Sequence, residues 1–174
     1  MNALDILLDA ASRPLDALEA LAPRLTDEVL NAHPAGHPNS VAWLLWHTGR
    51  EIDVQLAHLT GGDELWHAQG FRDRSGLGSA GDAIGYGHSP DEARAIAVDD
   101  ASVLVDYVAA CTDALLAYLD TLSEADLDDV VDDNWDPPVT RGVRLVSIID
   151  DAAQHIAQAA YVVGMPTDTS PPSR

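Results

Sequence analysis

The spacing of apolar residues restricts this chain to a helical fold. Apolar side chains recur every three or four positions over residues 3–21, 39–60, 89–122 and 141–163, which is the spacing of an amphipathic helix. No stretch shows a convincing strand alternation, although Val130-Val131 suits a short extended piece. Four long helices in 174 residues predict one all-α domain, a four-helix bundle.

Capping residues mark the expected helix ends. Asn39 or Ser40 suits the N-cap of the second helix, which we expect to stop at the glycine pair 61–62. The third helix is expected to begin near Ser89 or Asp99 and to end at Leu122. The helix ends therefore predict where the connections lie.

The connection between the second and third helices is unusually long. It covers residues 63–89 and contains six glycines, and a connection of this length is usually functional or folds into short turns of its own. It also allows helices that follow one another in sequence to pack apart, so the pattern leaves the topology open. We expect the bundle to occupy residues 1–166 and the polar residues 167–174 to form a flexible tail.

The charge of the chain excludes several classes of partner. Nine basic residues, all arginines, stand against 29 acidic ones, and the formal net charge is −20. The scattered arginines form no basic patch for nucleic acid or an anionic membrane surface. No apolar run approaches the roughly 18–20 residues of a spanning helix, and Asp5 stands too early for a signal peptide. The single cysteine, Cys111, cannot form an internal disulfide, so we expect a cytoplasmic protein. Its apolar neighbours predict that it lies in the core.

Polar residues interrupt the apolar faces of two predicted helices. His47 and Glu51 lie four residues apart at the rim of one face, and Asp151 and His155 lie four apart on the last helix. Side chains at that spacing reach one point. Carboxylates and imidazoles on facing helices are how bundles hold divalent metals. Two histidines and one carboxylate would leave positions open for water or substrate.

Each of these residues also has a structural interpretation. Asp151 and His155 can form a simple ion pair, and Glu51, like its neighbours Arg50 and Asp53, can be a solvated helix residue. The other histidines are expected at the surface or in structural roles; they are His33, His37, His58, His67 and His88. The tryptophans are expected in packing, with Trp43 and Trp46 in the core or an interface and with Trp66 and Trp135 holding loops onto the bundle.

Two motifs resemble a known family. The stretch HPNSVAWLLWHTGR (37–50) is similar to the second helix of the DinB-like superfamily, and SIIDDAAQHIAQAAY (147–161) is similar to its last helix. The segments GYGH (85–88) and DDNWDPPVT (132–140) look like an uncharacterised actinobacterial branch. The resemblance covers about residues 4–165. The superfamily includes bacillithiol- and mycothiol-dependent transferases and the N-terminal domain of maleylpyruvate isomerase.

The resemblance implies a fold and a metal site. The family fold is a four-helix bundle whose second helix is not the closest neighbour of the first. Its members typically bind Zn or Ni through three histidines. Two of these positions are His47 and His155 in this chain, and Gln158 follows as in the family. The third position is Asp151 in this chain, a departure that would give a site of two histidines and one carboxylate.

The resemblance also implies two alternative functions. The first is a thiol-dependent S-transferase or isomerase acting on small electrophiles, with Zn, Ni or Fe activating the thiol or water, mycothiol as the natural cosubstrate, and Glu51 orienting His47 or acting as base. Trp66, Phe71 and Tyr86 of the long connection would shape the substrate mouth. The second is a ligand-binding or assembly protein that has lost the metal site. A homodimer is expected under both.

Overall fold

The structure is a computed structural model, and it describes residues 1–165. The four long helices are α1 (Ala3–Leu21), α3 (Val41–Thr60), α7 (Ala101–Leu119) and α8 (Arg141–Gly164). The short helices are α2 (Asp27–Leu30), α4 (Leu65–Ala68), α5 (Phe71–Ser75) and α6 (Pro90–Arg94), and the strands are β1 (Val130–Asp132) and β2 (Val139–Thr140). The predicted flexible tail, 167–174, lies outside the described residues.

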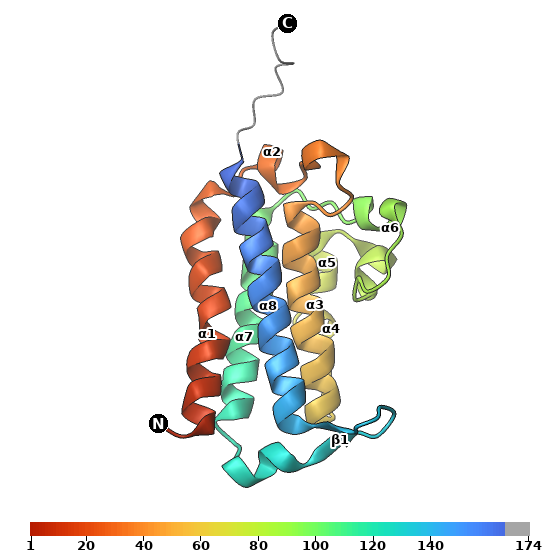
Figure 1. Ribbon diagram of the computed structural model, residues 1–174. Coiled ribbons are helices and arrows are strands. Elements are labelled where there is room, and N and C mark those ends of the chain that lie inside the picture. The colour runs from red at the N-terminus through yellow and green to blue at the C-terminus, as the bar shows by residue number, and fades with distance from the viewer. Residues whose placement is uncertain (166–174) are drawn as a thin grey trace, which may run out of the picture.

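The long helices form a bundle in which α1 and α3 lie diagonally opposite. Each of them packs against both α7 and α8. In Figure 1, α1 and α8 run upward while α3 and α7 run downward, so the two helices that follow one another across the long connection are parallel. The prediction of an all-α four-helix bundle is confirmed, and so is the expected separation of the first two long helices.

The third long helix begins next to the later of its two predicted starts, Asp99, and not at Ser89. Ser89 caps the short α6, and Asp100 caps α7 by accepting a hydrogen bond from the Ser102 N–H at 2.9 Å. Between them, the side-chain amide of Asn31 donates a hydrogen bond to the Val98 carbonyl at 2.9 Å and accepts one from the Val98 N–H at 3.1 Å. This pairing holds Val98 in a non-helical conformation, so the chain cannot continue one helix from Ser89.

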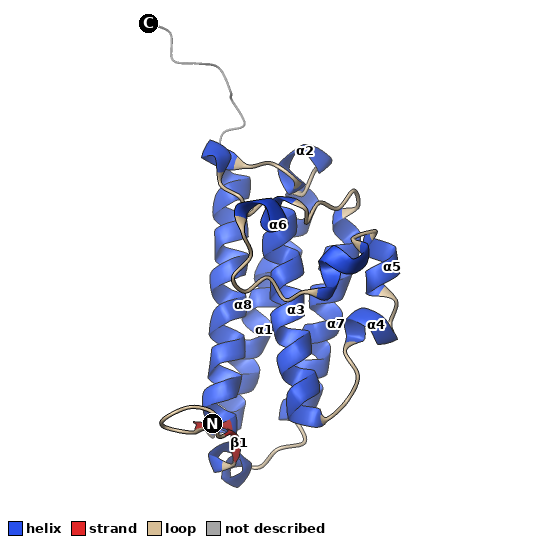
Figure 2. Cartoon of the chain, turned by 90° about the vertical axis from the view of Figure 1, so that its right-hand side faces the viewer, coloured by secondary structure: helices blue, strands red, loops and turns tan. Residues whose placement is uncertain are grey.

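The long connection folds against α3 and α7. It contains α4, α5, the 3₁₀ turn Gly78–Asp82 and α6. Figure 2 shows α6 in front of the bundle and α4 and α5 at its right-hand side. Trp66 and Phe71 are buried, with ring centroids 5.1 and 4.9 Å from that of Tyr107. The prediction that Trp66 packs a loop onto the bundle is confirmed, whereas its expected place in a substrate mouth, shared with Phe71, is wrong.

The connection between α7 and α8 closes the other end of the bundle. It contains the 3₁₀ turn Glu124–Asp128 and the antiparallel pair β1–β2, which confirms the extended piece expected at Val130-Val131. Trp135 lies between the strands and is 66% exposed. The expectation that Trp135 packs a loop onto the bundle is therefore wrong.

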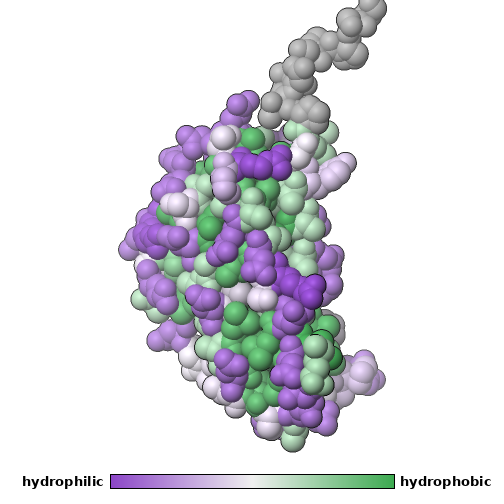
Figure 3. All heavy atoms as spheres, turned by 90° about the vertical axis from the view of Figure 1, so that its left-hand side faces the viewer, coloured by the Kyte–Doolittle hydropathy of each residue, from purple (hydrophilic) through white to green (hydrophobic). Residues whose placement is uncertain are grey.

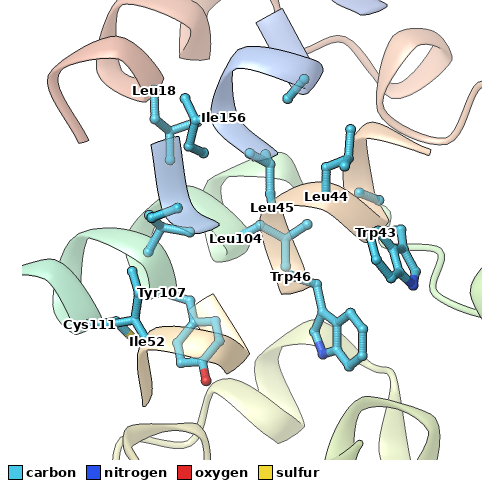
Figure 4. Close-up of a cluster of buried hydrophobic side chains, with 14 of the residues drawn as sticks. Leu18, Trp43, Leu44, Leu45, Trp46, Ile52, Leu104, Tyr107, Cys111 and Ile156 are labelled. Atoms are coloured by element: carbon cyan, nitrogen blue, oxygen red, sulfur yellow. The ribbon is translucent and has the colours of Figure 1, made fainter. Parts of the chain in front are cut away.

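The core lies between all four long helices. In Figure 4, Leu18 of α1 lies beside Ile156 of α8, and Leu45 of α3 lies beside Leu104 of α7. Cys111 is buried in this cluster, as its neighbours predicted, and burial raises the pKa of its thiol well above the usual value.

Helix α7 is apolar enough in length and composition to cross a membrane, which corrects the expectation that no stretch of the chain reaches this limit. Its side chains account for that composition. Leu104, Val108 and Leu115 are buried between the other helices of the bundle. The hydropathy of α7 is thus that of a core helix.

The outer face of α1 combines charged and apolar side chains. Figure 3 shows apolar atoms gathered among hydrophilic ones over the lower half of this face. Ile6 is 56% exposed and lies beside a groove that continues onto Val146 and Ala153 of α8. The groove is an apolar surface on α1, and the expected homodimer stays a prediction.

Candidate metal centre

Helix α3 contributes His47, a buried side chain whose orientation is set from outside the helix. Its Nδ1–H donates to the Ile84 carbonyl of the long connection at 2.5 Å, which leaves Nε2 free to face α8. Burial lowers the pKa of the imidazole, the bond to Ile84 opposes that effect, and the neighbouring His155 lowers the pKa further. The lowered pKa favours the neutral imidazole, which is the form that binds a metal.

Helix α8 contributes Asp151 and His155, both half-buried. His155 Nδ1–H donates to the Gln158 amide oxygen at 3.1 Å, and its Nε2 lies 3.4 Å from Asp151 Oδ1. Burial lowers the pKa of His155, but the hydrogen bond and charge of Asp151 outweigh burial, so the pKa is raised overall. The last-helix pair thus meets at one point, as its spacing predicted.

The three predicted residues converge across the seam between α3 and α8. One donor atom from each of His47, Asp151 and His155 lies within 4.8 Å of the other two, and the two imidazole centroids are 4.6 Å apart. Asp151 Oδ2 is buried and has no hydrogen-bond partner among residues 1–165. A buried carboxylate oxygen without a partner is costly, and a cation between these donors would remove that cost. The residues therefore fit a divalent metal.

Aromatic rings cover one side of the three donors. Trp43 stacks on His47 at 4.5 Å between centroids and meets His155 edge-on at 6.1 Å. His88 stacks on Trp46 at 5.6 Å and accepts a hydrogen bond from Trp43 Nε1 at 3.3 Å. Trp43 and Trp46 are buried, as expected, and His88 has the structural role expected of it.

A cavity of 450 Å³ opens beside the donors. Glu51, Gln55, Tyr86 and Ser147 share its lining with the three candidate ligands. Burial and the charge of Asp151 raise the pKa of Glu51, against smaller effects of His155 and of its hydrogen bond from Gln55. Glu51 does not orient His47, because the Ile84 carbonyl holds that imidazole. Its remaining predicted role is that of a base.

A buried polar network fixes the long connection behind His47. Arg50 is 1% exposed and donates to Glu64 at 2.8 Å and to the Ala83 carbonyl at 3.0 Å. Asp53 is 2% exposed and accepts from Tyr107 Oη–H at 2.7 Å. The expectation that Arg50 and Asp53 are solvated is wrong, because the long connection folds over this face of α3.

Sequence analysis missed this network, although one signal pointed to it. Residues 41–46 read Val-Ala-Trp-Leu-Leu-Trp and are apolar on every side of the helix, and a helix that is apolar all round is covered all round. All six are buried. The charged residues that follow one turn later are then expected to be buried and paired as well.

Glycine at position 85 is required by the approach of the long connection to His47. Gly85 has φ +95°, and a Cβ there would lie 2.7 Å from His47 Nδ1. We expect Gly85→Ala to weaken Zn²⁺ affinity by about 10–100-fold, the usual effect of disturbing the partner of a metal-binding histidine. Gly87→Ala is the matched control, since Gly87 also has positive φ but nothing within 4 Å. Equal affinities for the two variants, by competition with a chromophoric chelator, would contradict this prediction.

Metal affinity is expected to fall in acid. A proton and a metal compete for Nε2 of His155, and the pKa of His155 is raised by Asp151. Affinity should therefore be highest above that pKa and fall about tenfold for each pH unit below it. Zn²⁺ titrations between pH 5.5 and 8 measure this dependence. A pH-independent affinity would mean that His155 is not a ligand.

The fold and the site define a four-helix bundle protein with a candidate metal centre of two histidines and one carboxylate between α3 and α8. The family model of the DinB superfamily matches residues 10–159, so the chain belongs to the DinB superfamily. The crystal structure of a conserved protein from Enterococcus faecalis is similar, with a TM-score of 0.85 and 38% identity, over 94% of this chain and 96% of that one. A comparison with curated proteins finds no match.

Proposed function

We propose that this protein is a metal-dependent enzyme that acts on small electrophiles with a low-molecular-weight thiol. It either joins the thiol to the electrophile through sulfur, as an S-transferase, or uses the thiol to isomerise the electrophile. The observation that carries the proposal is the buried Asp151 Oδ2, without a partner among the described residues, beside two oriented imidazoles. Membership of the DinB superfamily supports the use of a thiol, because the members that this chain resembles include bacillithiol- and mycothiol-dependent transferases. Zn, Ni and Fe are the metals that suit this donor set, and mycothiol is the proposed cosubstrate.

The chain's own residues prepare the site for this chemistry. When bound at His47, Asp151 and His155, a divalent metal would lower the pKa of a coordinated thiol or water. Trp43 limits the access of water from one side, and Ile84 and Gln158 bind Nδ1 of the two imidazoles, so that Nε2 of each faces the site. These contacts orient the two imidazoles and shield the site, and they contribute no proton to the reaction.

Glu51 is the proposed base. It lines the cavity with the ligands, and its raised pKa brings it closer to neutral pH, where a base works best. It would take the proton of the thiol, whose sulfur then bonds to an electrophilic carbon while the leaving group departs with its electron pair. In an isomerisation no group leaves. The sulfur instead adds to a carbon of a conjugated double bond, whose electron pair moves toward the conjugated carbonyl oxygen. The new single bond rotates, the pair returns and expels the sulfur, and the sulfur recovers the proton.

The experiment compares Glu51→Gln with Glu19→Gln, an exposed residue on α1. Thiol consumption is measured with mycothiol and a set of small electrophiles, after metal content is determined by elemental mass spectrometry. We expect Glu51→Gln to keep its metal and to lose activity by about 10²–10⁴-fold, while Glu19→Gln keeps both. Unchanged activity in Glu51→Gln would remove the base assignment.

The ion pair between Asp151 and His155 favours the alternative function, a non-catalytic ligand-binding protein. In that case the carboxylate and imidazole satisfy one another and hold no metal. Protein that stays metal-free after incubation with Zn²⁺, Ni²⁺ and Fe²⁺ would support this alternative and overturn the enzyme proposal.

A further inference from the structure

A second cavity lies along the same helix seam as the candidate metal centre, toward the C-terminal end of α8. Its volume is 910 Å³, and it lies between the loop at residues 34–39, Leu44 of α3 and the last turns of α8. We call it the upper groove. In Figure 1 this loop is the orange segment above the start of α3, close to the upper half of α8.

The lining of the upper groove differs from the rest of the protein surface. Among the described residues, none of those that line it is acidic or an arginine, in a chain with 29 acidic residues and a net charge of −20. Leu44, Val162 and Met165 contribute apolar surface, and Tyr161, a residue that is 71% exposed, also lines the groove. A surface free of carboxylates is one that an apolar group can cover without desolvating charge.

The upper groove is joined to the candidate metal centre through His155. This residue lines both the upper groove and the 450 Å³ cavity that holds Glu51. The two cavities therefore share one candidate ligand. The polar cavity also contains the carboxylates of Glu51 and Asp151, whereas the upper groove contains apolar and uncharged polar side chains. A molecule bound in the upper groove therefore lies next to a candidate metal ligand.

We propose that the upper groove binds the apolar body of the electrophilic substrate, while the polar cavity at Glu51, Gln55 and Ser147 takes the hydroxyl-bearing thiol. The inference rests on the proposed function for the reacting end of the substrate. The volume of the upper groove lies in the range of small-molecule sites, roughly 300–1,000 Å³. The substrate class is thus a neutral electrophile with an alkyl chain or aromatic ring.

The first test uses metal-free protein and probes that have no thiol. Binding of 1-butanol, 1-hexanol and 1-octanol is followed by amide NMR shifts at Leu44, Ala157 and Val162. We expect affinity to rise about two- to fourfold with each added methylene, because each methylene that is partly buried contributes a similar gain. A chain-length series with no change in affinity, or with shifts elsewhere in the bundle, would overturn the proposal.

A matched pair of variants on α8 shows where the alcohols bind. Ala157→Glu places a carboxylate at the upper groove, whereas Ala153→Glu adds the same charge one turn away. Both alanines are exposed and both line the groove between α1 and α8, but only Ala157 lines the upper groove. We expect Ala157→Glu to remove the chain-length dependence and Ala153→Glu to keep it. Equal loss in both variants would place the alcohols between α1 and α8 and overturn the proposal.

A second series separates this inference from the proposed function. The affinities of 2-mercaptoethanol, 4-mercapto-1-butanol and 6-mercapto-1-hexanol are measured by calorimetry on Zn²⁺-loaded and metal-free protein. A gain on loading together with a rise along the series supports both. A rise without a gain keeps the upper groove and contradicts the thiol site. A gain without a rise keeps the thiol site and overturns the upper groove.

Discussion

Protein with the substitution His155→Ala is expected to lose its metal. The change removes one of three donors that lie within 4.8 Å of one another and leaves Asp151 without its imidazole partner. Because disturbing only the partner of a metal-binding histidine costs about 10–100-fold in affinity, we expect removal of a ligand to weaken Zn²⁺ binding by more than about 100-fold. Elemental mass spectrometry of protein purified without a His-tag or chelator measures the result.

The neighbouring residue Gln154 offers the control. Its side chain is exposed and bonds Asp150, away from the candidate ligands, so Gln154→Ala should keep the wild-type metal content. His155 is only half-buried, and we expect the helical circular dichroism of His155→Ala to match that of the wild type. A folded His155→Ala protein with full metal content would show that the proposed centre is wrong.

The substitution Asp53→Ala is expected to destabilise the protein by about 3–5 kcal/mol, the usual cost of breaking a buried charged network. Asp53 accepts hydrogen bonds from the backbone of Leu65 and Trp66 at 2.8 Å each and from Tyr107. Its removal leaves these donors buried without a partner, and Arg50 loses one of its two carboxylates. Urea denaturation followed by circular dichroism gives the free energy of unfolding.

Asp63 provides the comparison for this prediction. It is an exposed aspartate near the start of the same connection, and Asp63→Ala should change the free energy of unfolding by no more than about 0.5 kcal/mol. If Asp53→Ala were as stable as Asp63→Ala, the buried network would not be what holds the long connection to α3.

The candidate ligands were predictable because each helix places its polar residues by a fixed period. His47 and Glu51, and likewise Asp151 and His155, repeat at four residues on the rim of an apolar face. The roles of Arg50 and Ile84 were not predictable in the same way. Arg50 is buried by a connection whose path no periodicity determines, and Ile84 acts through its backbone carbonyl, which no residue type specifies.

The sequence by itself determined the four helices, most of their ends and the polar rims, because helical period and capping are local properties of the chain. The residue pattern did not determine the packing order of the helices, which only the family resemblance implied. Nor did it determine that α6 is separate from α7, or that Trp66 and Phe71 pack on Tyr107 while Trp135 is exposed. Tertiary structure decided these features. They depend on contacts between residues distant in sequence, such as Asn31 with Val98 and Asp53 with Trp66, and such contacts form only when the helices have packed.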